Sequence, residues 1–274
     1  MRPHVLILGG TTEARELGLA LSQRNFATTI SLAGRTATPA AQPVPVRRGG
    51  FGGADGLAEF LRTAKVDFLI DATHPYAQTI SANAAVAAAR TNIPLLGLGR
   101  PQWTAVHGDH WIDVAGSQDA VRALGSRPLR VFLAVGRQEL APFGSAPQHY
   151  YVVRSVDRVE PPLAVPDVHY ILARGPFTES EDRALLESFA IDAVVAKNSG
   201  GEATYGKISA ARALGLPVFM FKRPVVPDVP SVATVAEAVA WLDHAVGLNA
   251  GSAADSARES AADSAIGRAV PRGV

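Results

Sequence analysis

Short apolar runs alternate along this chain with alanine-rich stretches in which apolar residues recur at helical spacing. Strands that are apolar on both faces and alternate with helices are typical of a parallel sheet covered on both sides. The pattern predicts strands over residues 5–8, 27–32, 66–71, 93–98, 129–135, 150–153, 170–173, 192–196 and 217–221. It predicts helices over residues 12–24, 77–91, 179–189, 204–214 and 232–246.

The alternation falls into two series, which predicts an α/β fold of two Rossmann-like doubly wound parallel-sheet domains in tandem. We place the N-terminal domain at residues 1–113 and the C-terminal domain at residues 114–248. The stretch over 100–114 is compatible with a linker and with a crossing strand. Residues 249–274 are small and polar, so they cannot bury enough surface to offset their ordering entropy. We expect a disordered tail there, with an interaction helix as the alternative.

Composition narrows the class of protein. The 274 residues contain no cysteine, which excludes a disulfide scaffold and a cysteine-based zinc site. The net charge of +1 argues against nucleic-acid binding through bulk electrostatics. No apolar run approaches the length of a membrane helix, and the run over 5–8 is too short for a signal peptide. We therefore expect a cytoplasmic protein with no nucleic-acid or membrane partner, and a monomer is the working expectation.

A glycine turn joins the first predicted strand to the first predicted helix. This geometry directs free backbone N–H groups and the positive end of the helix at a phosphate. Compared with the dinucleotide fingerprint, Gly9 holds the first glycine position, Thr11 replaces the second and Ala14 occupies the third. We expect the Thr11 hydroxyl to reach the same anion. The candidate phosphate loop is Gly9, Gly10, Thr11, Thr12 and Glu13, and a plain tight turn is the alternative.

The end of the second strand indicates the cofactor. An acidic residue there suits the ribose hydroxyls of NAD, whereas arginine suits the 2′-phosphate of NADP. This chain has no carboxylate at that place but has Ser31, Gly34, Arg35 and Thr36. Arginine matches phosphate oxygens with paired donors. The four residues together favour NADPH, although a solvated surface arginine would explain Arg35 alone.

The third strand ends in Asp71-Ala72-Thr73-His74-Pro75-Tyr76-Ala77. Ligands of open parallel sheets bind at the carboxyl ends of the strands. We therefore assign Thr73 to the cofactor site, and His74 and Tyr76 to the nicotinamide or the substrate. A structural turn fixed by Pro75 is the alternative.

Several catalytic signatures are absent from the sequence. It contains no Tyr-x-x-x-Lys pair, no Gly-x-Ser-x-Gly elbow and no Walker loop. Its seven histidines form no recognised metal-ligand motif, so we expect no metal.

The second half of the chain carries cationic side chains just after predicted strands. Because the carboxyl ends of parallel strands share one edge, these residues are expected to converge on an anionic ligand. Solvated strand-end residues are the alternative for any one of them. The candidate substrate-binding residues are Gly136, Arg137, Arg154, Arg174, Lys197, Asn198, Ser199, Gly200 and Gly201.

Five blocks, in order, resemble the precorrin-6A reductase family of cobalamin biosynthesis. The blocks are residues 7–14, 31–35, 71–77, 136–137 and 197–201. The resemblance covers most of the chain except the tail. Its Thr-His-Pro-Tyr-Ala and Lys-Asn-Ser-Gly-Gly blocks are more specific than the glycine-led ones.

The resemblance implies an NADPH-dependent reduction of a macrocycle double bond, which converts precorrin-6A into precorrin-6B. It implies that the first domain binds NADPH, that the second binds an anionic tetrapyrrole, and that the substrate cleft lies between them. A proton must be added besides the hydride, and Lys197, Tyr76 and His74 are the candidate donors. Three alternatives stay open: reduction of the cobalt-containing substrate, a nucleotide-sensing module without catalysis, and a sugar-nucleotide epimerase or reductase. The absent Tyr-x-x-x-Lys pair disfavours the last.

Overall fold

The computed structural model describes residues 2–34 and 40–247. Its first sheet has six parallel strands in the order β12-β5-β4-β1-β2-β3. These are β1 (His4–Leu8), β2 (Ala27–Leu32), β3 (Val46–Arg48), β4 (Phe68–Asp71), β5 (Leu95–Leu98) and β12 (Ser231–Val232). Its helices include α1 (Thr12–Ser22), α2 (Gly53–Thr63) and α3 (Gln78–Thr91).

The second sheet also has six parallel strands, in the order β6-β11-β10-β7-β8-β9. These are β6 (His110–Val114), β7 (Arg130–Ala134), β8 (Tyr150–Ser155), β9 (Val168–Leu172), β10 (Ala193–Lys197) and β11 (Pro217–Phe221). The helices are α4 (Ser117–Leu124), α5 (Glu179–Ser188) and α6 (Gly206–Ala213), with short 3-10 turns at Arg137–Glu139, Ala141–Ser145 and Glu202–Thr204. The predicted class, two Rossmann-like parallel-sheet units in tandem, is confirmed.

Each sheet is covered on both faces, as the apolar strands predicted. In the first domain, α1 and the helix over 235–247 pack on one face, and α2 and α3 pack on the other. In the second domain, α4 and the segment over 140–143 cover one face, and α5 and α6 cover the other. Central strands such as β1 and β10 are buried almost throughout, which explains why they lack a polar–apolar alternation.

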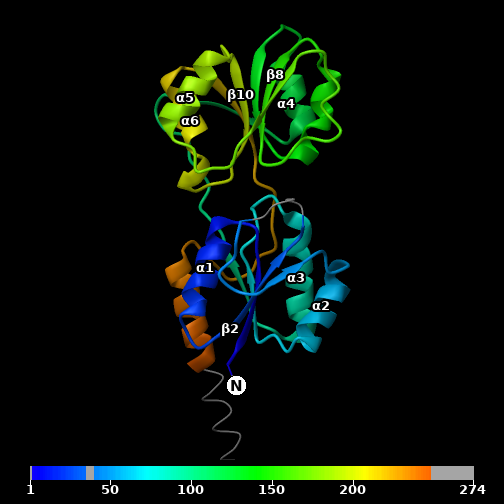
Figure 1. The fold of residues 1–274 in the computed structure, drawn as a ribbon, viewed down its shortest axis with the longest axis vertical. Helices are drawn as coiled ribbons and strands as arrows, with labels where there is room; N and C mark the ends of the chain where they lie inside the picture. Colours follow the sequence, from blue (N-terminus) through cyan, green and yellow to red (C-terminus); the bar gives the residue numbers. More distant parts are fainter. Residues whose placement is uncertain (1, 35–39, 248–274) are drawn as a thin grey trace, which may run out of the picture.

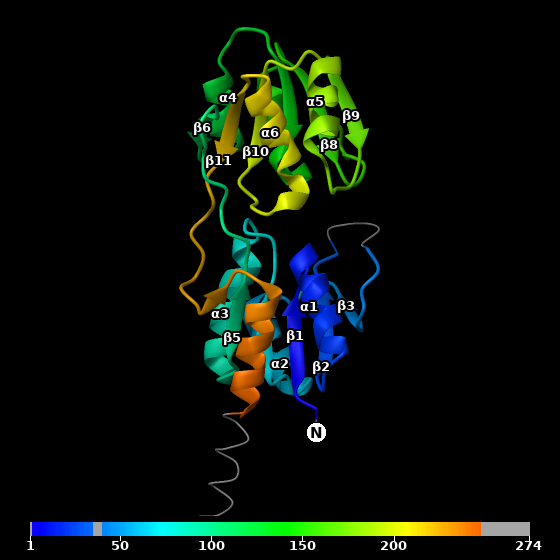
Figure 2. The ribbon, with the colours of Figure 1, turned by 90° about the vertical axis from the view of Figure 1, so that its left-hand side faces the viewer.

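The chain passes between the two domains twice. Residues 99–109 lead from β5 to β6, and residues 222–230 lead from β11 back to β12. Strand β12 then pairs with β5, and the helix over 235–247 contributes Ala238 and Leu242 to the core of the first domain. Figure 2 shows this helix, in orange, beside the first sheet.

The return of the chain changes two expectations. The sequence pattern predicts a second domain over all of 114–248, whereas residues 231–247 complete the first domain. The stretch over 100–114 is both a linker and a strand, because β6 forms an edge of the second sheet. Periodicity alone did not reveal either point, since an apolar helix face does not state which sheet it will cover. The expected disordered tail, residues 249–274, lies outside the described residues.

The carboxyl edges of the two sheets face each other. Tyr76 follows β4 of the first sheet, and its hydroxyl bonds to Phe221 at the end of β11 and to Asn198 just after β10. Figure 1 shows the two domains stacked along the long axis, joined at these edges. Within the part of the chain that the structure describes, no helix is long and apolar enough to span a membrane.

Candidate functional site at the junction of the two sheets

The turn between β1 and α1 is built for close backbone approach. The Gly9 amide donates to the Ser31 carbonyl at 2.9 Å, and a Cβ on Gly9 would lie only 2.8 Å from Ile30. Gly10 has φ +120°, a conformation that favours glycine, and a Cβ there would meet nothing within 4 Å. The first amides of α1 have no intrahelical partner and lie beside this open backbone. The turn therefore fits an anion such as a cofactor phosphate.

The Thr11 side chain has a different role from the expected anion contact. Its hydroxyl accepts from the Ala14 amide at 3.2 Å and donates to the Ala72 carbonyl at 2.7 Å. Thr11 therefore caps α1 and ties this turn to the end of β4. The next residue, Thr12, is exposed. The Glu13 carboxylate lies 3.5 Å from the Arg100 guanidinium, so it links α1 to the first connecting segment.

Beside the end of β2, strand β3 places a cation that the sequence pattern did not indicate. Ser31 is buried, and the Arg47 guanidinium of β3 lies 3.4 Å from its hydroxyl. Gly34 is exposed with φ +76°. Two of the predicted cofactor residues, Arg35 and Thr36, lie outside the described residues. The sequence signal for Arg47 was a pair of adjacent arginines. Strand β3 has only three residues, which is too short for a recognisable pattern of apolar positions.

At the end of β4, the polar residues fix the loop. Asp71 Oδ1 accepts from the Thr73 amide at 3.1 Å and from the Thr73 hydroxyl at 2.7 Å. The Thr73 hydroxyl also lies 3.5 Å from that of Ser81 on α3. Thr73 therefore stays a cofactor candidate on position, although its hydroxyl already serves the loop.

Tyr76 bridges the two domains. Its hydroxyl donates to the Phe221 carbonyl and accepts from the Asn198 amide at 2.9 Å, and its ring packs against the core of the second domain. Burial raises the pKa of Tyr76 to about 12. A phenol held in this way fits a structural latch better than the proton donor that the sequence suggested.

His74 is a neutral imidazole at physiological pH. Burial, together with the positive charges of Lys197 and Arg100, lowers its pKa to about 3. Its Nδ1 accepts from the Tyr76 amide at 3.3 Å. It can orient a ligand through a hydrogen bond, but it does not supply a proton as imidazolium near pH 7.

Lys197, at the end of β10, pairs with a carboxylate that the sequence analysis did not single out. Its ammonium forms an ion pair with Glu139 of the turn after β7 and lies 4.9 Å from the centroid of the Tyr76 ring. Gly136 makes room for this pair, because a Cβ there would lie 2.4 Å from Glu139 Oε2. Lys197 is only 14% exposed, and it lies at the edge of the second sheet that faces the first domain.

The other predicted cations differ among themselves. Arg154 is 8% exposed, forms a buried ion pair with Asp182 and stacks on Phe177, so it holds the interior of the second domain together. This placement corrects its assignment to substrate binding. Arg137 lies 3.5 Å from Asp157 at the carboxyl edge of the second sheet, here called the second edge. Arg174 is exposed after β9.

The residues after Lys197 form the joint between domains. Asn198 exchanges two hydrogen bonds with the backbone of Trp103 in the first connecting segment, at 2.8 and 2.9 Å. Arg223 of the second segment donates to the carbonyls of Asn198 and Arg100.

The two glycines of the same block are needed because the first connecting segment approaches their backbone closely. A Cβ on Gly200 would lie 2.2 Å from the Pro101 carbonyl, and one on Gly201 would lie 2.4 Å from Arg100. Ser199 bonds within the loop, to Thr204 at 3.2 Å. Asn198, Gly200 and Gly201 therefore fix the two sheets relative to each other.

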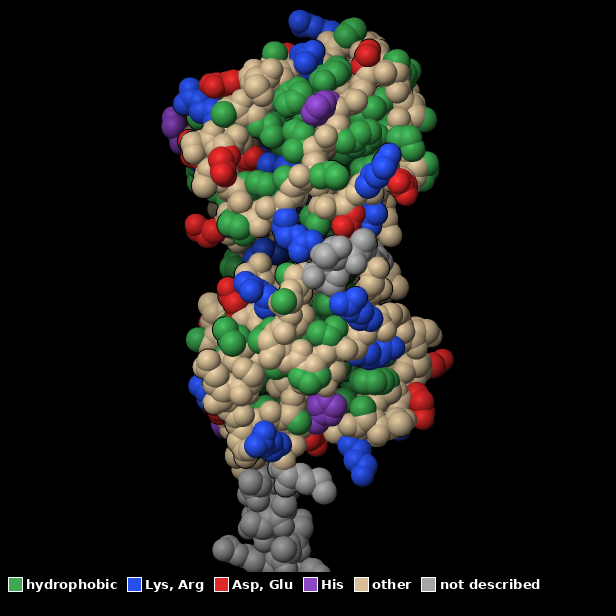
Figure 3. Space-filling view, in the orientation of Figure 1, with side chains coloured by type: hydrophobic (Ala, Val, Ile, Leu, Met, Phe, Trp, Pro, Cys, Tyr) green, Lys and Arg blue, Asp and Glu red, His purple; other side chains and the backbone are tan. Residues whose placement is uncertain are grey.

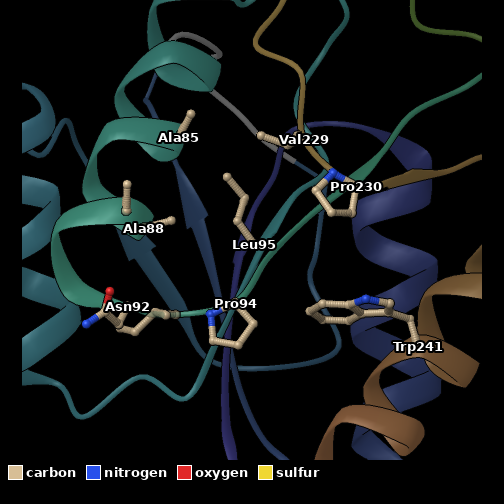
Figure 4. A pocket seen from close by; sticks show the side chains of 10 residues that line it. Ala85, Ala88, Asn92, Pro94, Leu95, Val229, Pro230 and Trp241 are labelled. Carbon is tan, nitrogen blue, oxygen red and sulfur yellow. The ribbon is translucent and has the colours of Figure 1, made fainter.

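Two hollows lie outside this arrangement or at its side. One of about 470 Å³ is lined by apolar residues near Pro94 and Trp241 at the amino end of β5, away from the edge where ligands of parallel sheets bind (Figure 4). Another, of about 380 Å³, lies between Trp103, Trp111 and Arg223 beside the joint. Within the described ranges, no cluster of three or more potential metal ligands occurs.

The junction gathers both halves of the predicted site. The carboxyl edge of the first sheet, here called the first edge, contributes the Gly9–Glu13 turn, Thr73 and His74. The second edge contributes Gly136, Arg137 and Lys197. In the view of Figure 3 the molecule narrows here, and Lys and Arg side chains gather on both sides of the waist. The fold and the site define a tandem Rossmann-like α/β protein with its candidate site between two facing carboxyl edges.

Comparison with known proteins gives the family. Residues 4–243 match the family model described as precorrin-6x reductase CbiJ/CobK, and the chain belongs to this family. It is 56% identical to a precorrin-6A reductase of Sinorhizobium sp over 244 residues, which cover 89% of this chain and 94% of that protein. It is 49% identical to the precorrin-6A reductase of Rhodobacter capsulatus, over 88% of this chain and 96% of that protein.

Solved structures agree with the sequence relatives. The structure described as CobK precorrin-6A reductase superimposes with a TM-score of 0.85 at 48% identity, covering 88% of this chain and 96% of that one. Relatives described as cobalt-precorrin-6A reductases are more distant, such as that of Priestia megaterium at 28% identity over 80% of this chain and 90% of that protein.

Proposed function

We propose that this chain is an oxidoreductase that reduces precorrin-6A to precorrin-6B with NADPH, in cobalamin biosynthesis. The observation that carries the proposal is the match to proteins described as precorrin-6A reductases over nearly their whole length. The higher identity to these than to the cobalt-precorrin relatives favours the metal-free substrate. The cytoplasmic location and the monomeric state remain predictions.

The first edge offers the residues for NADPH, which supplies the hydride when bound. The open backbone at Gly10 and the amides of Thr12 and Glu13 at the start of α1 suit the pyrophosphate, and the ends of such strands at Ser31 and Gly34 suit the adenosine ribose. The sequence also assigns Arg35 and Thr36 to the 2′-phosphate. An Arg35→Ala change should weaken NADPH binding far more than NADH binding, and equal losses would remove Arg35 from the phosphate site.

The second edge offers a proton. Reduction of a carbon–carbon double bond needs a proton as well as a hydride, and Lys197 carries one at an edge that faces the cofactor turn. Glu139 holds the ammonium in place, and Tyr76 packs beside it. Arg137 and Arg174 are the remaining candidates for the carboxylates of the tetrapyrrole. The protein mainly orients the two reactants, because the macrocycle itself accepts the electrons.

One assay tests the reaction. The protein is mixed with NADPH and precorrin-6A, and the loss of nicotinamide absorbance is followed together with product formation. Oxidation coupled to precorrin-6B supports the proposal. Binding of both ligands without oxidation would identify a nucleotide-sensing module instead, and faster turnover of the cobalt-containing substrate would favour the anaerobic reaction.

A Lys197→Met enzyme tests the proton donor. We expect kcat to fall roughly 10²- to 10⁴-fold, as for the loss of a general acid, with little change in the affinity for NADPH. Unchanged turnover would remove Lys197 from the chemistry.

A further inference from the structure

Arg47 is a partly buried cation whose contacts are with neutral groups. Its guanidinium donates to the carbonyls of Gly49 and Gly50 at 2.5 and 2.8 Å and to the Ser31 hydroxyl at 3.4 Å. It stacks on the ring of Phe51, with 3.7 Å between its central carbon and the ring centroid. The three hydrogen bonds leave part of its five-donor fork available.

No carboxylate among the described residues forms an ion pair with Arg47. The undescribed segment over 35–39 reads Arg-Thr-Ala-Thr-Pro and contains no acidic residue. Burial lowers the pKa of Arg47, in line with its lack of a carboxylate partner among the described residues. A partly desolvated cation without a counter-charge is costly, and a bound anion would relieve that cost.

The position of Arg47 in the sheet identifies which anion fits. Arg47 of β3 is in register with Ser31 of β2, so the two side chains stand on the same face near the carboxyl ends of adjacent strands. The Gly9 amide of the phosphate turn bonds to the carbonyl of that same Ser31. In dinucleotide-binding sheets the end of the second strand contacts the adenosine ribose, and an arginine nearby accepts the 2′-phosphate.

We propose that Arg47 binds the 2′-phosphate of NADPH and is a determinant of the preference for NADPH over NADH. The inference rests on the proposed use of a nicotinamide cofactor. The planar fork matches phosphate oxygens, and the Phe51 ring and the two carbonyls hold it in orientation. The phosphate would supply a negative charge that none of the described residues places beside Arg47.

Binding measurements without substrate test this role. Affinities for NADPH, NADH and the fragment 2′,5′-ADP are measured for the unchanged protein and for Arg47→Met, Arg47→Lys and Arg48→Met. Methionine keeps the length of the side chain without its charge. Arg48 is the matched control, because it is the next residue of β3, is exposed and points to the opposite face.

We expect Arg47→Met to weaken NADPH and 2′,5′-ADP roughly 10- to 100-fold while NADH changes less than about threefold. Arg47→Lys should retain part of the preference and Arg48→Met nearly all of it. Thermal unfolding of each variant verifies that it is folded. If Arg47→Met does not fold, the comparison of NADPH with NADH is made on Arg47→Lys.

Two outcomes would overturn the inference in different ways. Equal losses for NADPH and NADH would show that Arg47 only shapes the loop over 49–51, and would leave the proposed reaction standing. An unchanged protein that binds neither NADPH nor 2′,5′-ADP would remove the cofactor proposal and this inference together.

Discussion

The two facing edges of this protein differ in how their charges are compensated. At the second edge each of three cations is near a carboxylate: Lys197 near Glu139, Arg154 near Asp182 and Arg137 near Asp157. At the first edge the phosphate turn offers backbone amides, and Arg47 has only neutral partners among the described residues. A count of cations therefore overstates the uncompensated positive charge of the second edge, and it leaves out the backbone amides of the first. Partners, more than residue types, decide what an edge can bind.

The largest expected effect comes from removing the carboxylate beside Arg154. Asp182→Ala leaves a buried guanidinium without its ion-pair partner, which should lower the free energy of unfolding by about 3–5 kcal/mol in a urea titration. Glu187→Ala is the control, because its pair with Arg183 is exposed and should contribute only about 0.3–0.5 kcal/mol. A loss below about 1 kcal/mol would mean that Arg154 does not depend on Asp182, and substrate binding by Arg154 would return as an explanation.

A smaller effect should follow from crowding the Lys197–Glu139 pair without removing either group. The Cβ of Gly136→Ala would lie 2.4 Å from Glu139 Oε2, so the carboxylate must move away from Lys197. We expect kcat to fall roughly 10-fold because the proton donor is misplaced, with stability nearly unchanged. Gly116→Ala is the control, since a Cβ there meets nothing within 4 Å. Full activity in Gly136→Ala would show that the pair does not position Lys197.

Tyr76→Phe separates a latch from a catalyst. Losing the hydroxyl leaves the Asn198 amide and the Phe221 carbonyl without this partner, so unfolding should become easier by about 1–2 kcal/mol. If the phenol transfers no proton, kcat should stay within about threefold. Tyr170→Phe is the matched control, because the Tyr170 hydroxyl also bonds to a backbone amide but lies away from the junction. A hundredfold loss of kcat at unchanged stability would restore Tyr76 as the donor.

The smallest expected effect is a pH dependence at His74. Its pKa is about 3 in the folded protein and near 6.5 when unfolded, so the unfolded state binds more protons between these values. The contribution of His74 to stability should therefore be fully present only well above pH 6.5 and fall as the pH drops, by about 0.7 kcal/mol from pH 7 to pH 6. Urea midpoints at the two pH values, compared between the unchanged protein and His74→Asn, measure this contribution. If the urea midpoint changes equally with pH in the unchanged protein and in His74→Asn, His74 makes no such contribution.

Local sequence patterns were sufficient for the fold class and for the position of the glycine turn after β1. The buried positions of β1 and β10 are all apolar. The close approach of Ile30 at Gly9 and the positive φ of Gly10 exclude most side chains at these two positions. These features depend on neighbours in sequence and on the general geometry of parallel sheets. The five motif blocks likewise pointed to the family without any knowledge of contacts.

Pairing and domain membership were decided only by the tertiary structure. Lys197 and Glu139 are 58 residues apart in sequence, and Arg154 and Asp182 are 28 residues apart. Arg47 lies beside Ser31 because β3 pairs with β2. The helix over 235–247 belongs to the first domain because the chain returns through β12. Tyr76 bonds to the second domain because the two sheets meet there. Each of these arrangements depends on interactions between residues distant in sequence, which no local pattern encodes. The sequence alone therefore determined which chemistry the chain contains, and the folded arrangement decided which of its charges remain available to a ligand.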